Sequence, residues 1–157
     1  MSLANIAFTL ALVFSGQVSP ARKPARSVRV GDLLVTATRV WVPQVPAGAD
    51  LSGRFHQFAV GVTVKNMSER ISHTRFVPIL KVKPDEEYIG YMKGSGDGVK
   101  APELYQLLPG EESTGAYRFV VRNGTTPVAL ILSYFSAGKE HRPSIELAGI
   151  VETETSR

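Results

Sequence analysis

The sequence predicts an all-β protein, built as a two-sheet antiparallel sandwich of about seven strands behind a short apolar N-terminal segment. Apolar residues recur at every second position in short runs, which is the period of half-buried strands. Glycine, proline and asparagine separate these runs, as they do at turns between strands. The chain contains no heptad repeat, no long helical stripe and no internal repeat, so we expect little helix.

The first two expected strands cover residues 33–41 ("LLVTATRVW") and 56–66 ("HQFAVGVTVKN"). Both alternate apolar and polar side chains, and the second does so most clearly. The inward positions are expected to be Leu33, Val35, Ala37 and Trp41 in the first strand, and Phe58, Val60, Val62 and Val64 in the second.

Residues 75–83 ("RFVPILKVK") form the third expected strand, with Phe76, Leu80 and Val82 directed inward. Pro78 lacks a backbone donor, so this strand is predicted to lie at a sheet edge or to break at the proline. A short strand is expected within 87–93 ("EYIGYMK").

Three further strands complete the sandwich. Residues 116–122 ("AYRFVVR") place Arg118 and Arg122 on the outward face. Residues 127–135 ("PVALILSYF") are almost entirely apolar, which predicts a central strand buried on both faces. Residues 144–151 ("SIELAGIV") form the last strand.

The chain divides into four expected regions. Residues 1–21 carry no charge and include an apolar run of signal-peptide length, so we expect a signal peptide or, if uncleaved, an anchor. Residues 22–29 form a basic linker, residues 30–151 form the sandwich, and residues 152–157 form a polar tail.

Composition excludes several classes of function. The 157 residues include no cysteine, which rules out disulfides, thiolate metal sites and a lipidated cysteine. The formal net charge is +4, but the basic residues are scattered one by one through the strands. A nucleic-acid site usually shows a basic stripe with stacking aromatic residues, so no nucleic-acid partner is expected.

The segment 110–115 ("GEESTG") resembles the nucleophile elbow of a hydrolase, with Ser113 as the candidate nucleophile. An elbow requires glycine two residues before the serine, where this chain has Glu111, and a helix after it, where a strand is predicted. We therefore expect a Pro109-Gly110 turn that leads into a strand, with Gly115 permitting a bulge. No catalytic residue, and no enzymatic activity, is predicted.

Metal binding rests on three histidines, His56, His73 and His141, which have no close His-x-His spacing. A histidine site would require folding to bring them together, so each is expected as a surface residue and no metal or other cofactor is predicted. The acids 85–87 and the loop around Asp97 lack the ligand spacing of a calcium loop.

Asn66 and Asn123 each stand in an Asn-x-Ser/Thr pattern, the acceptor pattern for glycosylation. Both lie at predicted turns, where asparagine is favoured for its side-chain hydrogen bonds. We therefore expect both asparagines to act primarily as turn residues.

Three segments together resemble a bacterial family: Val30-Gly31-Asp32, the strand Val62 to Asn66, and the segment Leu107 to Phe119. The family is the immunoglobulin-like domain of unknown function of secreted proteins and lipoproteins, which has the fold of the immunoprotective extracellular antigen. The resemblance extends from about Ser27 to Val151 and implies an extracytoplasmic, non-enzymatic, immunoglobulin-like sandwich. The lipidated cysteine usual in the family is absent here.

The expected function is therefore binding, by an extracytoplasmic domain that is periplasmic or secreted. Its expected partner is a protein or a cell-envelope component, recognised through a sheet edge or through the end loops 43–53 and 93–103. Membrane contact is expected only through residues 1–21, if they stay uncleaved. The alternative is a periplasmic sandwich that binds a metal through His56, His73 and His141.

Overall fold

The computed structural model describes residues 26–43, 53–90 and 100–150, and every regular element within these ranges is a strand. In that described part, no helix is present that has the length and hydropathy to cross a membrane. The strands are β1 (Ser27–Val30), β2 (Leu33–Trp41), β3 (Phe55–Asn66), β4 (Val77–Lys83), β5 (Glu86–Ile89), β6 (Glu112–Arg122), β7 (Thr126–Ser136), β8 (Lys139–His141) and β9 (Ser144–Glu146).

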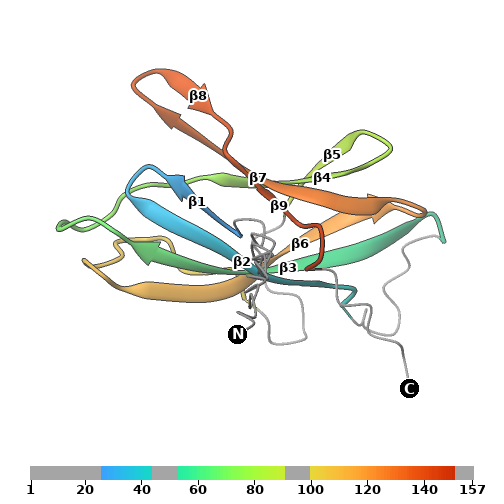
Figure 1. Cartoon of the computed structure of the whole chain (residues 1–157), viewed down its shortest axis with the longest axis horizontal. Helices are drawn as coiled ribbons and strands as arrows, with labels where there is room; N and C mark the ends of the chain where they lie inside the picture. The colour runs from blue at the N-terminus through green and yellow to red at the C-terminus, as the bar shows by residue number, and fades with distance from the viewer. Residues whose placement is uncertain (1–25, 44–52, 91–99, 151–157) are drawn as a thin grey trace, which may run out of the picture.

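Two antiparallel sheets face each other and form an immunoglobulin-like sandwich (Figure 1). One sheet has the order β1-β2-β3-β6, and the other has the order β5-β4-β7, with β8 and β9 both paired to β7. The chain crosses between the sheets after β3, after β5 and after β6. The order β2-β3-β6 facing β4-β7-β9 matches strands A, B and E facing C, F and G of an immunoglobulin-like domain.

The core lies between the sheets and is built by period-two alternation, as predicted. The inward residues of β3, Phe58, Val60, Val62 and Val64, are all buried. Those of β6 are buried beside them in the same sheet, those of β4 are buried in the facing sheet, and the middle of β7 is buried on both faces. The predicted central position of β7 is confirmed, because it pairs with β4 on one side and with β8 and β9 on the other.

The ends of the sandwich differ from the expectation in three places. Residues 27–29, expected in the basic linker, belong to β1 and pair with β2. The last strand, β9, has three residues rather than eight, although Leu147 and Ile150 beyond it still reach the core. Strand β8 was not expected, and it forms a hairpin with β7 that projects away from the rest of the sandwich at the upper left of Figure 1.

The prediction that Trp41 faces the core is wrong. The register of β2 against β3 shifts between Ala37 and Arg39, which marks a β-bulge. One extra residue reverses the alternation, so Val40 is buried in place of Trp41. Trp41 lies on the outer face, where the Arg39 guanidinium carbon is 4.0 Å from the centre of its ring.

Pro78 also lies differently from the expectation, since β4 is not an edge strand. Pairing between β4 and β5 ends at Ile79, one residue after the proline. The carbonyl of Pro78 accepts a hydrogen bond from Gly90 at 2.8 Å, on the β5 side. In an antiparallel strand the N–H of a residue points to the same side as its C=O, so the missing N–H of Pro78 faces β5 at the very end of the β4–β5 ladder, and the pairing with β7 loses no donor.

Arg118 points outward as predicted, opposite Ala59 on β3, but it is not solvated. Its side chain is only 6% exposed, and this burial lowers the pKa of the guanidinium below its usual value. Alternation therefore places the residue on the correct face, while its burial depends on tertiary packing.

Candidate functional site

Ser113 is not at a nucleophile elbow. It lies inside β6, opposite the buried Val64, and the strand continues to Arg122. Its hydroxyl accepts a hydrogen bond from the backbone N–H of Glu103 at 2.7 Å. The expected turn before it is confirmed, with Gly110 at a φ of 74° and a 3.0 Å hydrogen bond from the Glu111 N–H to the Leu108 carbonyl.

Gly115 has a different role from the bulge that we expected. Strands β3 and β6 pair without a register shift from Phe55 to Lys65, so no bulge is present there. A Cβ on Gly115 would lie 2.4 Å from the Lys100 oxygen and from the Pro102 nitrogen. The glycine makes room for segment 100–103, which docks on the free edge of β6 through a 2.9 Å hydrogen bond from Ala116 to Lys100. This segment is the described part of the expected loop 93–103.

The three histidines are not brought together. The Nδ1 atom of His56 lies 2.9 Å from Asn123 Oδ1, beside the turn between β6 and β7. His73 belongs to the connection between β3 and β4 at the other end of the sandwich, and His141 stacks on Tyr134 with ring centres 5.1 Å apart. Within the described ranges, no group of three or more His, Cys, Asp or Glu side chains could hold a metal ion.

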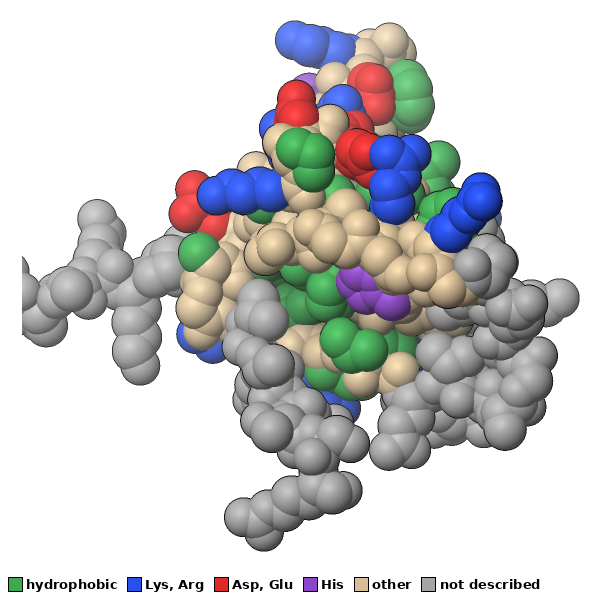
Figure 2. Space-filling view, turned by 90° about the vertical axis from the view of Figure 1, so that its right-hand side faces the viewer, with side chains coloured by type: hydrophobic (Ala, Val, Ile, Leu, Met, Phe, Trp, Pro, Cys, Tyr) green, Lys and Arg blue, Asp and Glu red, His purple; other side chains and the backbone are tan. Residues whose placement is uncertain are grey.

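The charged surface is mixed in sign. Figure 2 shows the end of the sandwich at the right of Figure 1, where blue and red side chains lie next to one another rather than in a basic stripe. The acids at 85–87, considered above for calcium, each pair with a cation: Asp85 with Lys81, Glu86 with Arg122, and Glu87 with Arg142. Asp97 lies outside the described residues.

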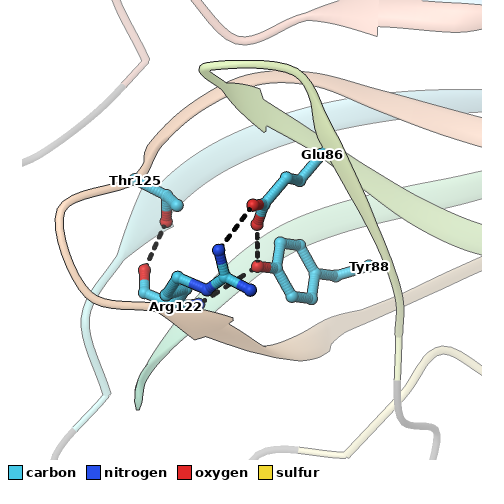
Figure 3. Close-up of polar contacts among 4 residues, drawn as sticks. All are labelled: Glu86, Tyr88, Arg122 and Thr125. Carbon is cyan, nitrogen blue, oxygen red and sulfur yellow. Dashed lines mark hydrogen bonds and ion pairs between the residues drawn. The ribbon is translucent and has the colours of Figure 1, made fainter. Parts of the chain in front are cut away.

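One of these pairs belongs to a polar network that joins the two sheets (Figure 3). Glu86 on β5 accepts hydrogen bonds from the Tyr88 hydroxyl and, at 3.1 Å, from Arg122 on β6. The Tyr88 hydroxyl accepts a hydrogen bond from the Arg122 N–H at 3.3 Å, and Thr125 donates to the Arg122 carbonyl at 2.8 Å. Its groups hydrogen-bond one another, so the network serves to fasten β5 to β6 rather than to present a reactive group.

Asn123 lies in a turn, as predicted, whereas Asn66 is the last residue of β3 and its side chain bonds to the connection that follows. Asn66 is 1% exposed, and its amide donates to the carbonyls of Arg70 and Leu107 at 2.7 and 2.9 Å. Its oxygen accepts hydrogen bonds from the N–H and the hydroxyl of Ser68. Asn66 thereby holds the start of the β3–β4 connection in place. Asn123 donates to the Gly53 carbonyl at 2.6 Å.

A hollow lies at the end of the sandwich to which Asn66 belongs, and we call it the end groove. It has a volume of about 900 Å³. Its two walls are residues from segment 68–77 and residues 133–136 of the β7–β8 hairpin, and Gly31 and Asp32 also line it. Of the end loops expected to carry contacts, residues 44–52 and 91–99 lie outside the described residues. The described lining of the groove comes from other segments.

Apolar side chains of both walls remain exposed in the end groove. Phe135 is 74% exposed, Ile71 45% and Val77 44%. Scattered exposed apolar residues are ordinary, but a cluster of them around a hollow marks an interaction site. The groove is therefore the best-formed candidate site in the described part of the chain.

The basic side chains Arg70 and Arg75 also line the groove. Arg75 lies over the ring of Tyr105, with its guanidinium carbon 5.4 Å from the ring centre. Within the described residues, neither arginine has an acidic side chain within 4.0 Å. The groove thus contains two arginines that form no ion pair with a described acid, and the Asp32 carboxylate lines it as well.

Asp32 is the acid among the described residues that line the groove, and its carboxylate already accepts hydrogen bonds from the protein itself. It accepts hydrogen bonds from the hydroxyls of Ser72, at 2.7 Å, and Thr74. Burial acts to raise the pKa of Asp32, but these hydrogen bonds outweigh it and the pKa lies below its usual value. Gly31 beside it has a φ of 59°, and a Cβ there would lie 2.8 Å from Thr74 Oγ1.

The Val30-Gly31-Asp32 motif is therefore explained by local structure. Its glycine permits the turn between β1 and β2, and its aspartate fixes the β3–β4 connection. From the sequence alone, the motif was only one of three segments that resemble the bacterial family. A hydrophilic loop that carries one isoleucine, "SERISHTRF" at 68–76, was the available signal for the groove wall.

Fold and groove together define an immunoglobulin-like β-sandwich with an open, partly apolar groove at one end. No family model and no curated protein matches the chain. A functionally unknown protein from Listeria monocytogenes has a similar structure, with a TM-score of 0.52 and 9% identity over 76% of this chain and 79% of that one. An uncharacterised β-sandwich protein from Clostridium difficile is more distant, with a TM-score of 0.42 and 10% identity over 78% of this chain and 91% of that one. At these identities the likeness concerns the fold alone.

Proposed function

We propose that the chain is a non-enzymatic, extracytoplasmic interaction domain that recognises a protein partner of the cell envelope through its end groove. The observation that carries the proposal is the exposure of Phe135, Ile71 and Val77 around one hollow. Burying such side chains against a partner removes apolar surface from water, at about 25 cal/mol for each Å². Aromatic residues in such positions often dominate the energy of an interface.

The non-enzymatic part of the proposal rests on how the candidate residues are used in the described part of the chain. The Ser113 hydroxyl accepts a hydrogen bond from the backbone N–H of Glu103, and His56 lies at the end of the sandwich opposite to the groove. The extracytoplasmic part rests on the apolar run within residues 1–21 and on the resemblance to secreted bacterial immunoglobulin-like domains.

The test is affinity capture with a matched pair of variants. The full chain with a C-terminal tag is expressed in its native cells, and the retained proteins are identified by mass spectrometry. Phe135→Ser removes the apolar contact in the groove, whereas Phe55→Ser changes a 40% exposed phenylalanine at the start of β3, at the other end of the sandwich. We expect one envelope protein to be retained by the native chain and by Phe55→Ser, and to be lost with Phe135→Ser.

Two results would count against the proposal. Retention of the same proteins by all three chains would remove the groove from the interaction. Protection of the chain from protease added to cells whose outer envelope has been opened would contradict the extracytoplasmic location.

A further inference from the structure

The end groove runs along the free edge of a strand. Four consecutive residues of β7 and its hairpin, Ser133 to Ser136, line it. Successive side chains of a strand point to opposite faces of a sheet, so a hollow that touches all four lies beside the strand edge rather than on one face. From Tyr134 to Ser136, β8 occupies one edge of the strand, and in the described part of the chain the opposite edge is open.

The open edge begins where β4 separates from β7. Val77 lies opposite Ser133, and the ladder between the two strands goes no further. Residues 70–76, which precede β4, form the other wall of the groove instead of continuing the pairing. Beyond Ser133, therefore, no described strand occupies the position beside Tyr134–Ser136.

The backbone groups of Phe135 point into this open position. The N–H of Leu132 donates to the Pro143 carbonyl at 2.9 Å, on the side of β8 and β9. Hydrogen-bonding direction alternates along an antiparallel strand, so Tyr134 and Ser136 also point toward β8, and Phe135 points away from it. The two-residue turn Ala137-Gly138 agrees, since Ser136 and Lys139 on either side of it form a hydrogen-bonded pair.

We propose that the groove binds an extended segment of a partner protein, which pairs with the free edge of Tyr134–Ser136 and places a carboxylate against Arg70 and Arg75. The edge supplies one N–H and one C=O from Phe135, which is the mode of recognition by strand addition. Ile71, Val77 and the Phe135 ring supply apolar contacts for alternate side chains of the segment. The two arginines favour an acidic side chain, since an arginine fork binds a carboxylate with two hydrogen bonds.

This inference rests on the proposed function and names the chemistry of its partner. It is tested with a phage-displayed library of random 12-residue peptides, selected on the purified full chain. We expect the selected peptides to be enriched in Asp or Glu beside an aliphatic or aromatic residue. The strongest peptide is then synthesised with a fluorescent label for affinity measurements.

Two pairs of measurements separate charge from backbone pairing. Arg70→Glu combined with Arg75→Glu is expected to weaken binding at least about tenfold, while the control Arg54→Glu, at the other end of the sandwich, leaves it unchanged. Changing the peptide's own acids to amides should give a similar loss without altering the protein. Two N-methylated peptides are compared, one methylated at the odd-numbered residues and one at the even-numbered residues. One of them should lose binding and the other should keep it, because only alternate N–H groups face β7.

Several outcomes would overturn the inference. The first is equal binding of the two N-methylated peptides, and the second is a set of selected peptides that is not enriched in Asp or Glu. The third is unchanged affinity for the arginine variants. The fourth is a selection on the native chain that recovers no more peptides than a selection on the Phe135→Ser chain. A native chain that sediments as a dimer, with Phe135→Ser as a monomer, would assign the groove to a second copy instead. An envelope protein retained through Phe135 but insensitive to charge reversal would overturn only the acidic extended segment and would leave the proposed function standing.

Discussion

Val77 lies opposite Ser133 as the last pair between β4 and β7, and beyond this pair the two segments separate to form the end groove. The separation is held from one side by Asn66 and Asp32, which fix the β3–β4 connection, and from the other by the β7–β8 hairpin. Stability measurements can therefore test how the groove is built, separately from what it binds.

Asn66→Ala is expected to lower the free energy of unfolding by about 2–3 kcal/mol, because two carbonyls and Ser68 lose their partner at a buried position. Urea denaturation measures this change. The control is Asn123→Ala. The side-chain amide of Asn123 makes its hydrogen bond at an exposed turn, so this variant should lose about 1 kcal/mol or less of unfolding free energy. Equal losses in the two variants would show that Asn66 does not hold the connection.

Gly115→Ala is expected to destabilise the chain by about 1–3 kcal/mol, since the new methyl group meets the backbone of segment 100–102. Backbone atoms cannot move aside as a flexible side chain can. Thr114→Ala, at the neighbouring exposed position, removes a cross-strand hydrogen bond to Thr63 but meets no backbone, and it should cost about 1 kcal/mol or less. A neutral Gly115→Ala in thermal unfolding would mean that segment 100–103 does not dock on β6.

Ala137→Asn is expected to stabilise the chain by about 1 kcal/mol. Ala137 has a φ of 51° and Gly138 a φ of 75°, so the hairpin turn is of the type that favours Asn-Gly. The left-handed conformation costs a residue such as alanine roughly 1–2 kcal/mol. Ala148→Asn, at an exposed turn position without positive φ, is the control and should give no gain. A loss of stability in Ala137→Asn would contradict the turn geometry.

Asp32 is expected to make stability depend on pH in the acid range. Its folded pKa is lowered below the unfolded value, so the charged form contributes stability above the unfolded pKa. That contribution is lost as pH falls through the folded pKa. Asp32→Asn should therefore lose less stability than the native chain when unfolding is compared at pH 6 and in strong acid. Parallel pH profiles for the two chains would exclude this role.

Much of the fold could be predicted because side-chain alternation survives wherever strands pair without a shift. The inward residues of β3, Phe58, Val60, Val62 and Val64, follow directly from period two, as does the central position of the apolar β7. Trp41 could not be placed, because a single extra residue at the bulge after Ala37 reverses the faces and leaves no mark in the residue types.

The site was harder to predict than the fold. A glycine in a strand indicates either a bulge or a close approach of another segment, and only the structure shows that Gly115 accommodates residues 100–102. The groove forms where segment 70–76 and the β7–β8 hairpin separate, although these segments are about 60 residues apart in sequence. Exposure of Phe135 depends on that separation, so alternation alone could not reveal it.

The central claim is that a protein partner occupies the end groove, and photo-crosslinking in native cells tests it most directly. A photoreactive benzoylphenylalanine is placed at Phe135, at Ile71 or at the control position Phe55, each of which is at least 40% exposed. We predict that the same partner protein is crosslinked from Phe135 and from Ile71, and that it is not crosslinked from Phe55. No adduct from either groove position, or the same adducts from all three, would contradict the account.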